Sequence, residues 1–228
     1  MEVGRVGVLG GTFNPIHLGH LHIAKKIQKL FSLSRVYFVV AATPPHKSPK
    51  NLIPFAHRYA MASLAVAGTA SFIPSMVELE SKPSPYSIDT MRKLARRLAT
   101  DKNSLHFIAG GDSLLEIKTW RQSEKLLNSY NFIFVLRPGI EKIDLEGFLP
   151  AKTLRRVRDF RELSRAQIGR RLAKETWGGN RIFLVDIDAP DISATEIRRN
   201  VSLRKSIHRM VPGPVGEYIR KLHLYGGR

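Results

Sequence analysis

The chain has 228 residues, of which 43% are hydrophobic and 25% are charged, a composition typical of a folded globular protein with one large domain or two small ones. Its 37 lysines and arginines against 19 acidic residues give a formal net charge of +18 at pH 7, which favours a negatively charged substrate or partner. The absence of cysteine excludes disulfides, zinc–thiolate sites and thiol nucleophiles. The sequence shows neither an apolar run long enough for a membrane span nor a signal-peptide pattern, so we expect a cytoplasmic protein.

Short apolar runs alternate with longer helical patterns along the chain. The predicted strands lie at residues 6–9, 36–40, 105–109, 132–136 and 182–185, and the predicted helices at 18–31, 56–67, 87–99, 123–128, 194–200 and 214–222. This alternation, with strands that are apolar throughout, is typical of a parallel sheet covered by helices on both faces. We therefore predict a single α/β domain with a doubly wound parallel sheet, in which ligands bind at the carboxyl ends of the strands.

The positive charge is densest between residues 151 and 175, where nine basic residues stand against three acidic ones. We predict a basic, helical insertion around residues 141–178. It is either a solvated surface or an arm that binds a polyanion, and the scarcity of interleaved aromatic residues argues against base stacking.

A candidate phosphate site follows the first predicted strand. Gly10 and Gly11 permit a tight turn and close approach of the backbone to a ligand, and the helix that follows begins with N–H groups that favour anions. His17 and His20 are three residues apart at the start of this helix, so their side chains share one face. Two imidazoles placed there can donate to phosphate oxygens and stabilise charge that develops at phosphorus. The alternatives are a pair of structural histidines, or a metal site, which lacks a third ligand at helical spacing.

A second helix start lies near residue 193. Ser193 and Glu196 have the spacing of a capping box, which predicts that a helix begins between them. The first turn adds the hydroxyl of Thr195, and Arg198 follows within about one further turn. Capping alone does not explain Thr195 and Arg198, whereas two anion-binding helix starts suit a triphosphate.

The two segments carry motifs of a known superfamily. Residues 11–20 read G-T-F-N-P-I-H-L-G-H and residues 192–198 read I-S-A-T-E-I-R, which match the motifs G-x-F-x-P-x-H-x-G-H and I-S-x-T-x-I-R of the nucleotidyltransferases. Within that superfamily the chain most resembles the bacterial nicotinate-nucleotide adenylyltransferases, because of residues 44–47 (P-P-H-K), 86–90 (Y-S-I-D-T) and 107–114 (F-I-A-G-G-D-S-L), followed by Trp120. The resemblance covers nearly the whole chain and is weakest between residues 140 and 180. It implies a Rossmann-like nucleotidyltransferase fold.

The resemblance also implies a reaction in NAD biosynthesis. A phosphate oxygen of nicotinate mononucleotide attacks the α-phosphorus of ATP, giving deamido-NAD and pyrophosphate, without a covalent enzyme intermediate. Catalysis then consists of aligning two polyanions and neutralising phosphate charge. Magnesium is expected on the triphosphate, held by phosphate oxygens and water and not by protein side chains.

The resemblance assigns roles to individual residues. The implied catalytic residues are His17, His20, Lys47 and Arg198; the ATP and phosphate site adds Gly10, Gly11, Thr12, Phe13, Ile192, Ser193 and Thr195; and the ribose and nicotinate site comprises Thr90, Gly110, Asp112 and Trp120. Asp112 can instead cap the helix that follows it, and Trp120 can instead be a core aromatic residue. Two positions depart from the family pattern. Asn14 replaces a common aspartate, and Arg121, which replaces a common tyrosine, would add a cation that favours the acid over the amide.

Other interpretations remain open. A nicotinamide-nucleotide or pantetheine-phosphate adenylyltransferase would share both phosphate motifs, although the segments around Thr90 and Trp120 argue against these acceptors. A basic nucleic-acid-binding module would explain the net charge without catalysis, and predicts salt-sensitive binding that does not need the two histidines. We expect ATP and nicotinate mononucleotide as partners and no membrane, and a homo-oligomer is compatible with the sequence.

Overall fold

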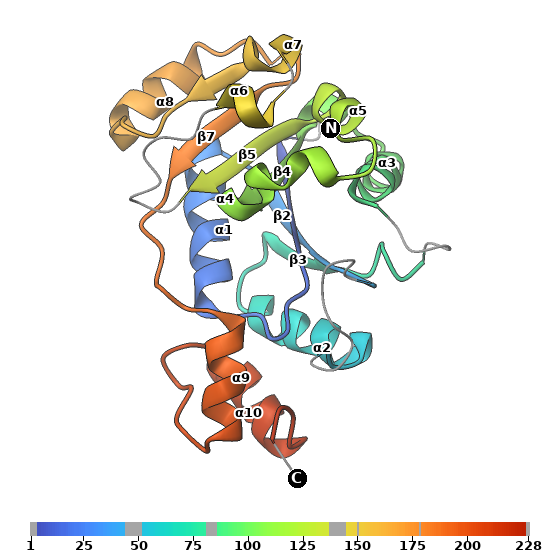
Figure 1. Ribbon diagram of the computed structural model, residues 1–228, viewed down its shortest axis with the longest axis vertical. Coiled ribbons are helices and arrows are strands. Elements are labelled where there is room, and N and C mark those ends of the chain that lie inside the picture. The colour runs from blue at the N-terminus through green and yellow to red at the C-terminus, as the bar shows by residue number, and fades with distance from the viewer. Residues whose placement is uncertain are drawn as a thin grey trace.

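The computed structural model describes residues 4–43, 52–80, 86–136, 145–149, 151–177 and 179–226. Its centre is one sheet of seven parallel strands in the order β3-β2-β1-β4-β5-β7-β6 (Figure 1). The strands are β1 (Val6–Gly11), β2 (Arg35–Val40), β3 (Phe72–Ser75), β4 (Leu105–Gly110), β5 (Asn131–Leu136), β6 (Val157–Asp159) and β7 (Ile182–Asp186). The order reverses between β1 and β4, which is the switch point where open α/β sheets bind their ligands.

The predicted doubly wound sheet is confirmed, and all five predicted strands are present. The sequence missed β3 and β6, which form the two edges of the sheet. Both strands are short, with four and three residues, and β3 contains Pro74. Because an edge strand pairs on one side only, it tolerates proline and need not carry a long apolar run.

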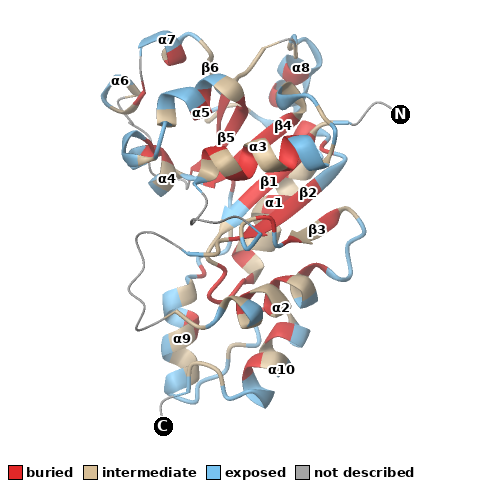
Figure 2. Cartoon of the chain, turned by 90° about the vertical axis from the view of Figure 1, so that its right-hand side faces the viewer, coloured by how far each residue is buried: buried red, intermediate tan, exposed pale blue. Residues whose placement is uncertain are grey.

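Helices cover both faces of the sheet. The longer helices are α1 (Leu18–Phe31), α2 (Phe55–Val66), α3 (Ser87–Arg97), α5 (Ser123–Ser129), α8 (Arg165–Ala173), α9 (Ala194–Ser202) and α10 (Gly213–Lys221), and the short ones are α4 (Gly111–Leu115), α6 (Leu145–Phe148) and α7 (Ala151–Leu154). Side chains alternate along each strand between two apolar clusters, one shared with α1, α2 and α8 and the other with α3, α4 and α5. Figure 2 shows that the buried residues gather in the strands, as a sheet covered on both faces requires.

The carboxyl ends of the strands face a separate group of helices. α2, α9 and α10 lie beyond this end of the sheet, and α10 packs against α2 (Figure 1). Val215 and Ile219 of α10 and Ile197 of α9 are buried in the same apolar cluster as α1. This arrangement brings the C-terminal part of the chain to the end of the sheet where the sequence predicts a ligand.

The basic segment lies at the opposite end of the molecule (Figure 1). Its described part contains α6, α7 and α8, in agreement with the predicted helical character, but also β6, which extends the sheet beside β7. Arg156 in this segment donates to Asn128, and Arg158 and Arg161 pair with Glu175 and Asp159. Among the described residues, no helix is long and apolar enough to cross a membrane.

Candidate active site

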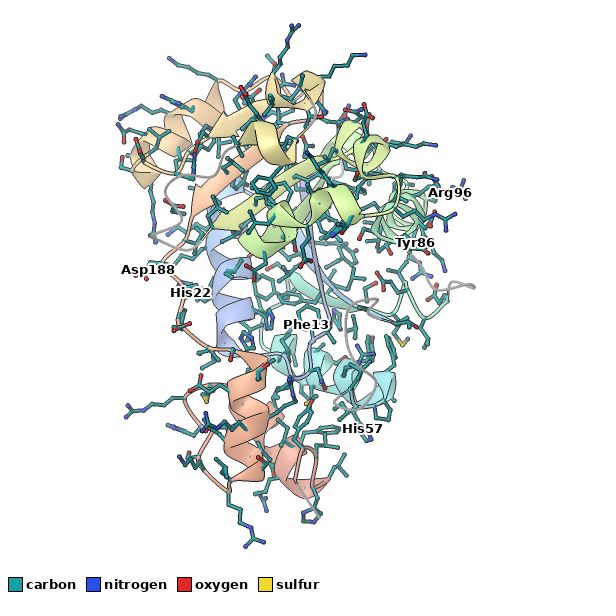
Figure 3. All side chains as sticks on the ribbon, viewed as in Figure 1. Phe13, His22, His57, Tyr86, Arg96 and Asp188 are labelled. Atoms are coloured by element: carbon teal, nitrogen blue, oxygen red, sulfur yellow. The ribbon has the colours of Figure 1, made fainter. Side chains whose placement is uncertain are left out.

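The loop between β1 and α1 follows a path that Gly11 makes possible. Phe13 has a left-handed backbone (φ 47°) and a side chain that is only 2% exposed. A Cβ on Gly11 would lie 2.7 Å from Cε1 of Phe13, closer than real Cβ contacts allow, whereas a Cβ on Gly10 would be 3.6 Å from the nearest ring atom of Phe107. Gly11 is therefore required by the packing of Phe13, which lies at the centre of the molecule (Figure 3).

The rings of the two histidines lie against each other, tilted by 31°, where α1 begins. His17 is the N-cap residue, and the centroids of the two rings are 3.7 Å apart. Phe13 meets the ring of His20 edge-on at 5.1 Å. Burial, with a further contribution from His17, holds the pKa of His20 well below its usual range. His20 is therefore neutral at pH 7 in the absence of an anion.

A backbone contact fixes which nitrogen of His20 carries the proton. The main-chain N–H of His17 donates to Nδ1 of His20 at 3.2 Å. A neutral imidazole that accepts at Nδ1 must carry its hydrogen on Nε2. The ring thus offers an N–H donor that can serve a phosphate oxygen.

The sequence predicts that the first N–H groups of α1 are available to an anion, but in the structure several of them have partners within the protein. The N–H of Leu18 donates to the carbonyl of Met210 at 2.9 Å, and that of His20 donates to the carbonyl of His17 at 3.0 Å. Together with the contact between His17 N–H and the His20 ring, these bonds occupy donors that the sequence had suggested for a ligand. The side chains of the histidines are consequently the better placed donors here.

Gly19 makes room for the ring of His17. A Cβ at this position would lie 3.1 Å from Nδ1 of His17, which is a tight contact, whereas the carbonyl of Pro190, which precedes the second motif, would lie at an ordinary contact distance of 3.6 Å. The missing side chain is therefore needed beside His17 and not beside the loop that leads to α9.

The second motif is organised as the sequence predicts. Ser193 is the N-cap of α9, and its hydroxyl accepts from the N–H of Glu196 at 3.1 Å. Ile192 is 9% exposed and anchors this turn in the core. The guanidinium of Arg198 donates to the hydroxyl of Thr195 at 3.2 Å and to the carbonyl of Asn14 at 2.9 Å. Arg198 thus joins the two motifs through a contact with a residue 184 positions before it in the sequence.

A buried arginine that sequence reasoning missed supports the same loop. Arg58 of α2 is 1% exposed and donates to the carbonyls of Thr12 at 2.8 Å and Ala41 at 2.7 Å, and also to those of Ala42 and Ile53. Burial lowers the pKa of Arg58, but arginine stays charged at pH 7. It therefore ties together the loops after β1 and β2. Its sequence signal is weak, because a single arginine within an apolar helix gives no hint of its partners.

Glu78 extends this buried network toward α3. Its carboxylate accepts from the N–H of Ala42 at 3.1 Å and from the hydroxyl of Thr90 at 2.9 Å. Burial raises the pKa of Glu78, and the charge of Arg58 opposes that shift. Thr90, predicted to meet the nicotinate carboxylate, is 2% exposed and uses its hydroxyl hydrogen in this contact.

The other predicted residues of the ribose and nicotinate site, Gly110, Asp112 and Trp120, lie at and after the carboxyl end of β4. Gly110 is the N-cap of α4, so Asp112, which is exposed in the first turn, is not the capping residue. Trp120 is half-buried, with its ring edge-on to Phe107 at 5.8 Å. Arg121 lies 4.5 Å from the ring centroid of Tyr86, which is labelled in Figure 3 just before α3. This contact brings together the segments around Thr90 and Trp120. Lys47 lies outside the described residues.

Comparisons with known proteins identify the family of the chain. A family model described as cytidylyltransferase-like matches residues 8–200. Proteins named probable nicotinate-nucleotide adenylyltransferase from Geobacter metallireducens and a Thermoanaerobacter species are 39% and 35% identical to the chain, covering 97% of it and 98% and 94% of their own lengths. A solved nicotinic acid mononucleotide adenylyltransferase of Plasmodium falciparum in complex with NaAD has the same fold, with a TM-score of 0.67 at 22% identity over 97% of each chain.

The matches span both motifs and nearly the full length of the bacterial relatives. They therefore do not depend on the phosphate site alone, which several kinds of nucleotidyltransferase share. The chain belongs to the cytidylyltransferase-like family and, within it, to the nicotinate-nucleotide adenylyltransferases.

Proposed function

We propose that the protein transfers the adenylyl group of ATP to nicotinate mononucleotide, giving deamido-NAD and pyrophosphate. The observation that carries this proposal is the contact of Arg198 with the carbonyl of Asn14, which places the second motif beside the histidine pair. The full-length bacterial relatives bear the name of this activity. A cytoplasmic location belongs to the same proposal.

The chemistry needs no nucleophile from the protein. A phosphate oxygen of nicotinate mononucleotide forms a bond to the α-phosphorus of ATP, and the bond from that phosphorus to its bridging oxygen breaks as pyrophosphate leaves. The protein must hold two polyanions in line and offset the charge on the transferring and leaving phosphates. The neutral His20 donates from Nε2 to a phosphate oxygen, and an anion bound there raises the pKa of the imidazole. Arg198 and the hydroxyls of Ser193 and Thr195 bind the leaving phosphates, and the family resemblance implies the same role for Lys47, which lies outside the described residues.

The donors gathered at this site suit a metal that arrives with the nucleotide. They are imidazole, guanidinium and hydroxyl groups, which bind phosphate oxygens more readily than Mg²⁺. In the described part of the chain, no group of three or more His, Asp or Glu side chains is placed to hold a metal ion. Mg²⁺ held by phosphate oxygens and water would supply charge neutralisation on the triphosphate.

For the acceptor, we propose that the pyridine ring binds between the segments of Thr90 and Trp120. The contact between Arg121 and Tyr86 supports this placement, because it closes one side of the region with a cation. Asp112 is exposed in the first turn of α4, directly after β4, where it can bind a ribose hydroxyl. The hydroxyl of Thr90 is buried and donates to Glu78, so it positions α3 and does not itself bind the pyridine ring.

The test compares acceptors and then removes the central donor. With ATP and Mg²⁺, nicotinate mononucleotide should be the preferred acceptor over nicotinamide mononucleotide and phosphopantetheine. The assignment fails if either alternative is preferred. His20→Ala should lower kcat by about 100-fold, the size of effect expected when one preorganised donor to a charged transition state is lost. His22→Ala, on the same helix, serves as the matched control. Salt-sensitive nucleic-acid binding without transfer of AMP would favour the binding-module alternative.

A further inference from the structure

The last described turn of the chain returns to the histidine loop. After α10 the backbone passes through two left-handed residues, His223 (φ 50°) and Tyr225 (φ 62°), and the side chains of Leu224 and Tyr225 pack against the apolar cluster around α1. The hydroxyl of Tyr225 donates to Oδ1 of Asn14 at 2.9 Å, across 211 residues of sequence. A non-glycine residue adopts a left-handed backbone only when its surroundings compensate the cost, and this hydrogen bond is one such contact.

Asn14 receives hydrogen bonds at both of its oxygens from the C-terminal third of the chain. Its side-chain oxygen accepts from Tyr225, and its carbonyl accepts from Arg198. Asn14 is 6% exposed, follows Phe13 directly and precedes His17 by three residues. The loop that sets the two histidine rings is therefore held at Asn14 by one group from α9 and one from the segment after α10.

The surroundings of Tyr225 keep its hydroxyl a donor. Burial raises the pKa of Tyr225 well above its usual value, although the nearby cations Arg58 and Arg198 act in the opposite direction. The phenol therefore stays protonated at neutral pH, and Asn14 is a neutral acceptor. The hydrogen bond is thus a constant structural contact at neutral pH and not a switch.

We propose that Tyr225 is a positioning residue for adenylyl transfer: through Asn14, its hydroxyl holds the loop that carries His17 and fixes the anchor point of Arg198. This inference rests on the proposed function. Neither phosphate motif includes Tyr225, so this role means that a residue outside both motifs helps to set the geometry of the phosphate site. Loss of the hydroxyl frees the loop to shift, and small displacements of donors lower the rate of an in-line reaction steeply.

A matched pair of tyrosines separates this role from general stability. The hydroxyl of Tyr218, on α10, is hydrogen-bonded to Nδ1 of His57 at 3.0 Å and so joins α10 to α2 without touching the histidine loop. Tyr225→Phe and Tyr218→Phe each remove one hydroxyl that has one side-chain partner. We expect similar melting temperatures for the two variants, a fall in kcat of about tenfold for Tyr225→Phe, and a change below about twofold for Tyr218→Phe.

A double-mutant cycle tests whether Tyr225 acts through Asn14. If it does, Tyr225→Phe in an Asn14→Ala background should lower kcat no further than Asn14→Ala alone. Independent, multiplicative losses would overturn the proposal, as would a kcat for Tyr225→Phe equal to that of Tyr218→Phe.

An NMR measurement on the free protein removes the dependence on activity. The ring signals of His17 and His20 should change in Tyr225→Phe and stay as in the wild type in Tyr218→Phe. Unchanged histidine signals in Tyr225→Phe would overturn the proposal. If the wild-type protein does not adenylylate nicotinate mononucleotide, the proposed function fails, and the histidine signals still decide whether Tyr225 positions the loop.

Discussion

His106 makes a quantitative prediction about stability and pH. It lies in β4 with its side chain fully buried, and its Nδ1 donates to the carbonyl of Ser104 at 3.1 Å. Its Nε2 is buried and has no hydrogen-bond partner among the residues that the structure describes. The ring of Trp177 meets it edge-on at 5.4 Å. Burial, with a smaller contribution from the charge of Arg5, lowers the pKa of His106 from 6.5 to about 4.

The sign of the effect follows from which state binds the proton. Well above pH 6.5 the imidazole is neutral in both the folded and the unfolded state, so it does not change the free energy of unfolding. As the pH falls below 6.5, His106 binds a proton in the unfolded chain but remains neutral in the folded protein down to about pH 4. The free energy of unfolding therefore decreases over this range. Linkage between these two values gives a loss of about 2 kcal/mol between pH 7.5 and pH 5, and of about 3 kcal/mol by pH 4.

Urea unfolding at pH 7.5 and pH 5 tests this value. His106→Asn keeps an N–H donor for the carbonyl of Ser104 but does not titrate. Between pH 7.5 and pH 5, the free energy of unfolding of the wild type should therefore decrease by about 2 kcal/mol more than that of the variant. Any loss of packing in the variant is the same at both pH values and cancels. His208→Asn, at an exposed histidine, should follow the wild type. The reasoning is refuted if wild type and His106→Asn lose stability equally, within about 0.5 kcal/mol.

Three further substitutions test the site. Arg58→Lys keeps the charge, but one ammonium group cannot reach the carbonyls after both β1 and β2. The free energy of unfolding, measured with urea, should therefore decrease by about 2–4 kcal/mol. A decrease below about 0.5 kcal/mol would contradict the bridging role. Gly11→Ala should cost about 1–3 kcal/mol in the same assay because its Cβ displaces Phe13, while Gly10→Ala is the tolerated control, and equal effects would refute the argument. Arg121→Tyr should lower the ratio of kcat/KM for nicotinate over nicotinamide mononucleotide, and an unchanged ratio would remove Arg121 from acceptor selection.

Much of the fold follows from local sequence pattern. Five strands are apolar and long enough to be recognised one at a time, because strands buried on both faces have no polar side to break the run. The edge strands β3 and β6 lack that pattern, and only pairing with β2 and β7 makes them strands. The same limit applies to the basic segment, which was predicted as helical: β6 forms there only by pairing with β7, and local sequence does not show that pairing.

The sequence by itself determined the chemistry of the phosphate site. The glycines, the histidine pair and the Ser193 cap are each recognisable within ten residues, because turn geometry and helix capping are local. Only the tertiary structure decided how these groups are held. Arg58, Glu78 and Tyr225 act on the site through contacts that span between 12 and 211 residues, and no spacing rule links such partners. The start of α1 shows the same limit, because the N–H expected to meet an anion is used by Met210, a residue that reaches it only in the folded chain. Local sequence thus specifies which donors and turns exist, and burial with long-range hydrogen bonding decides which of them remain available to a ligand.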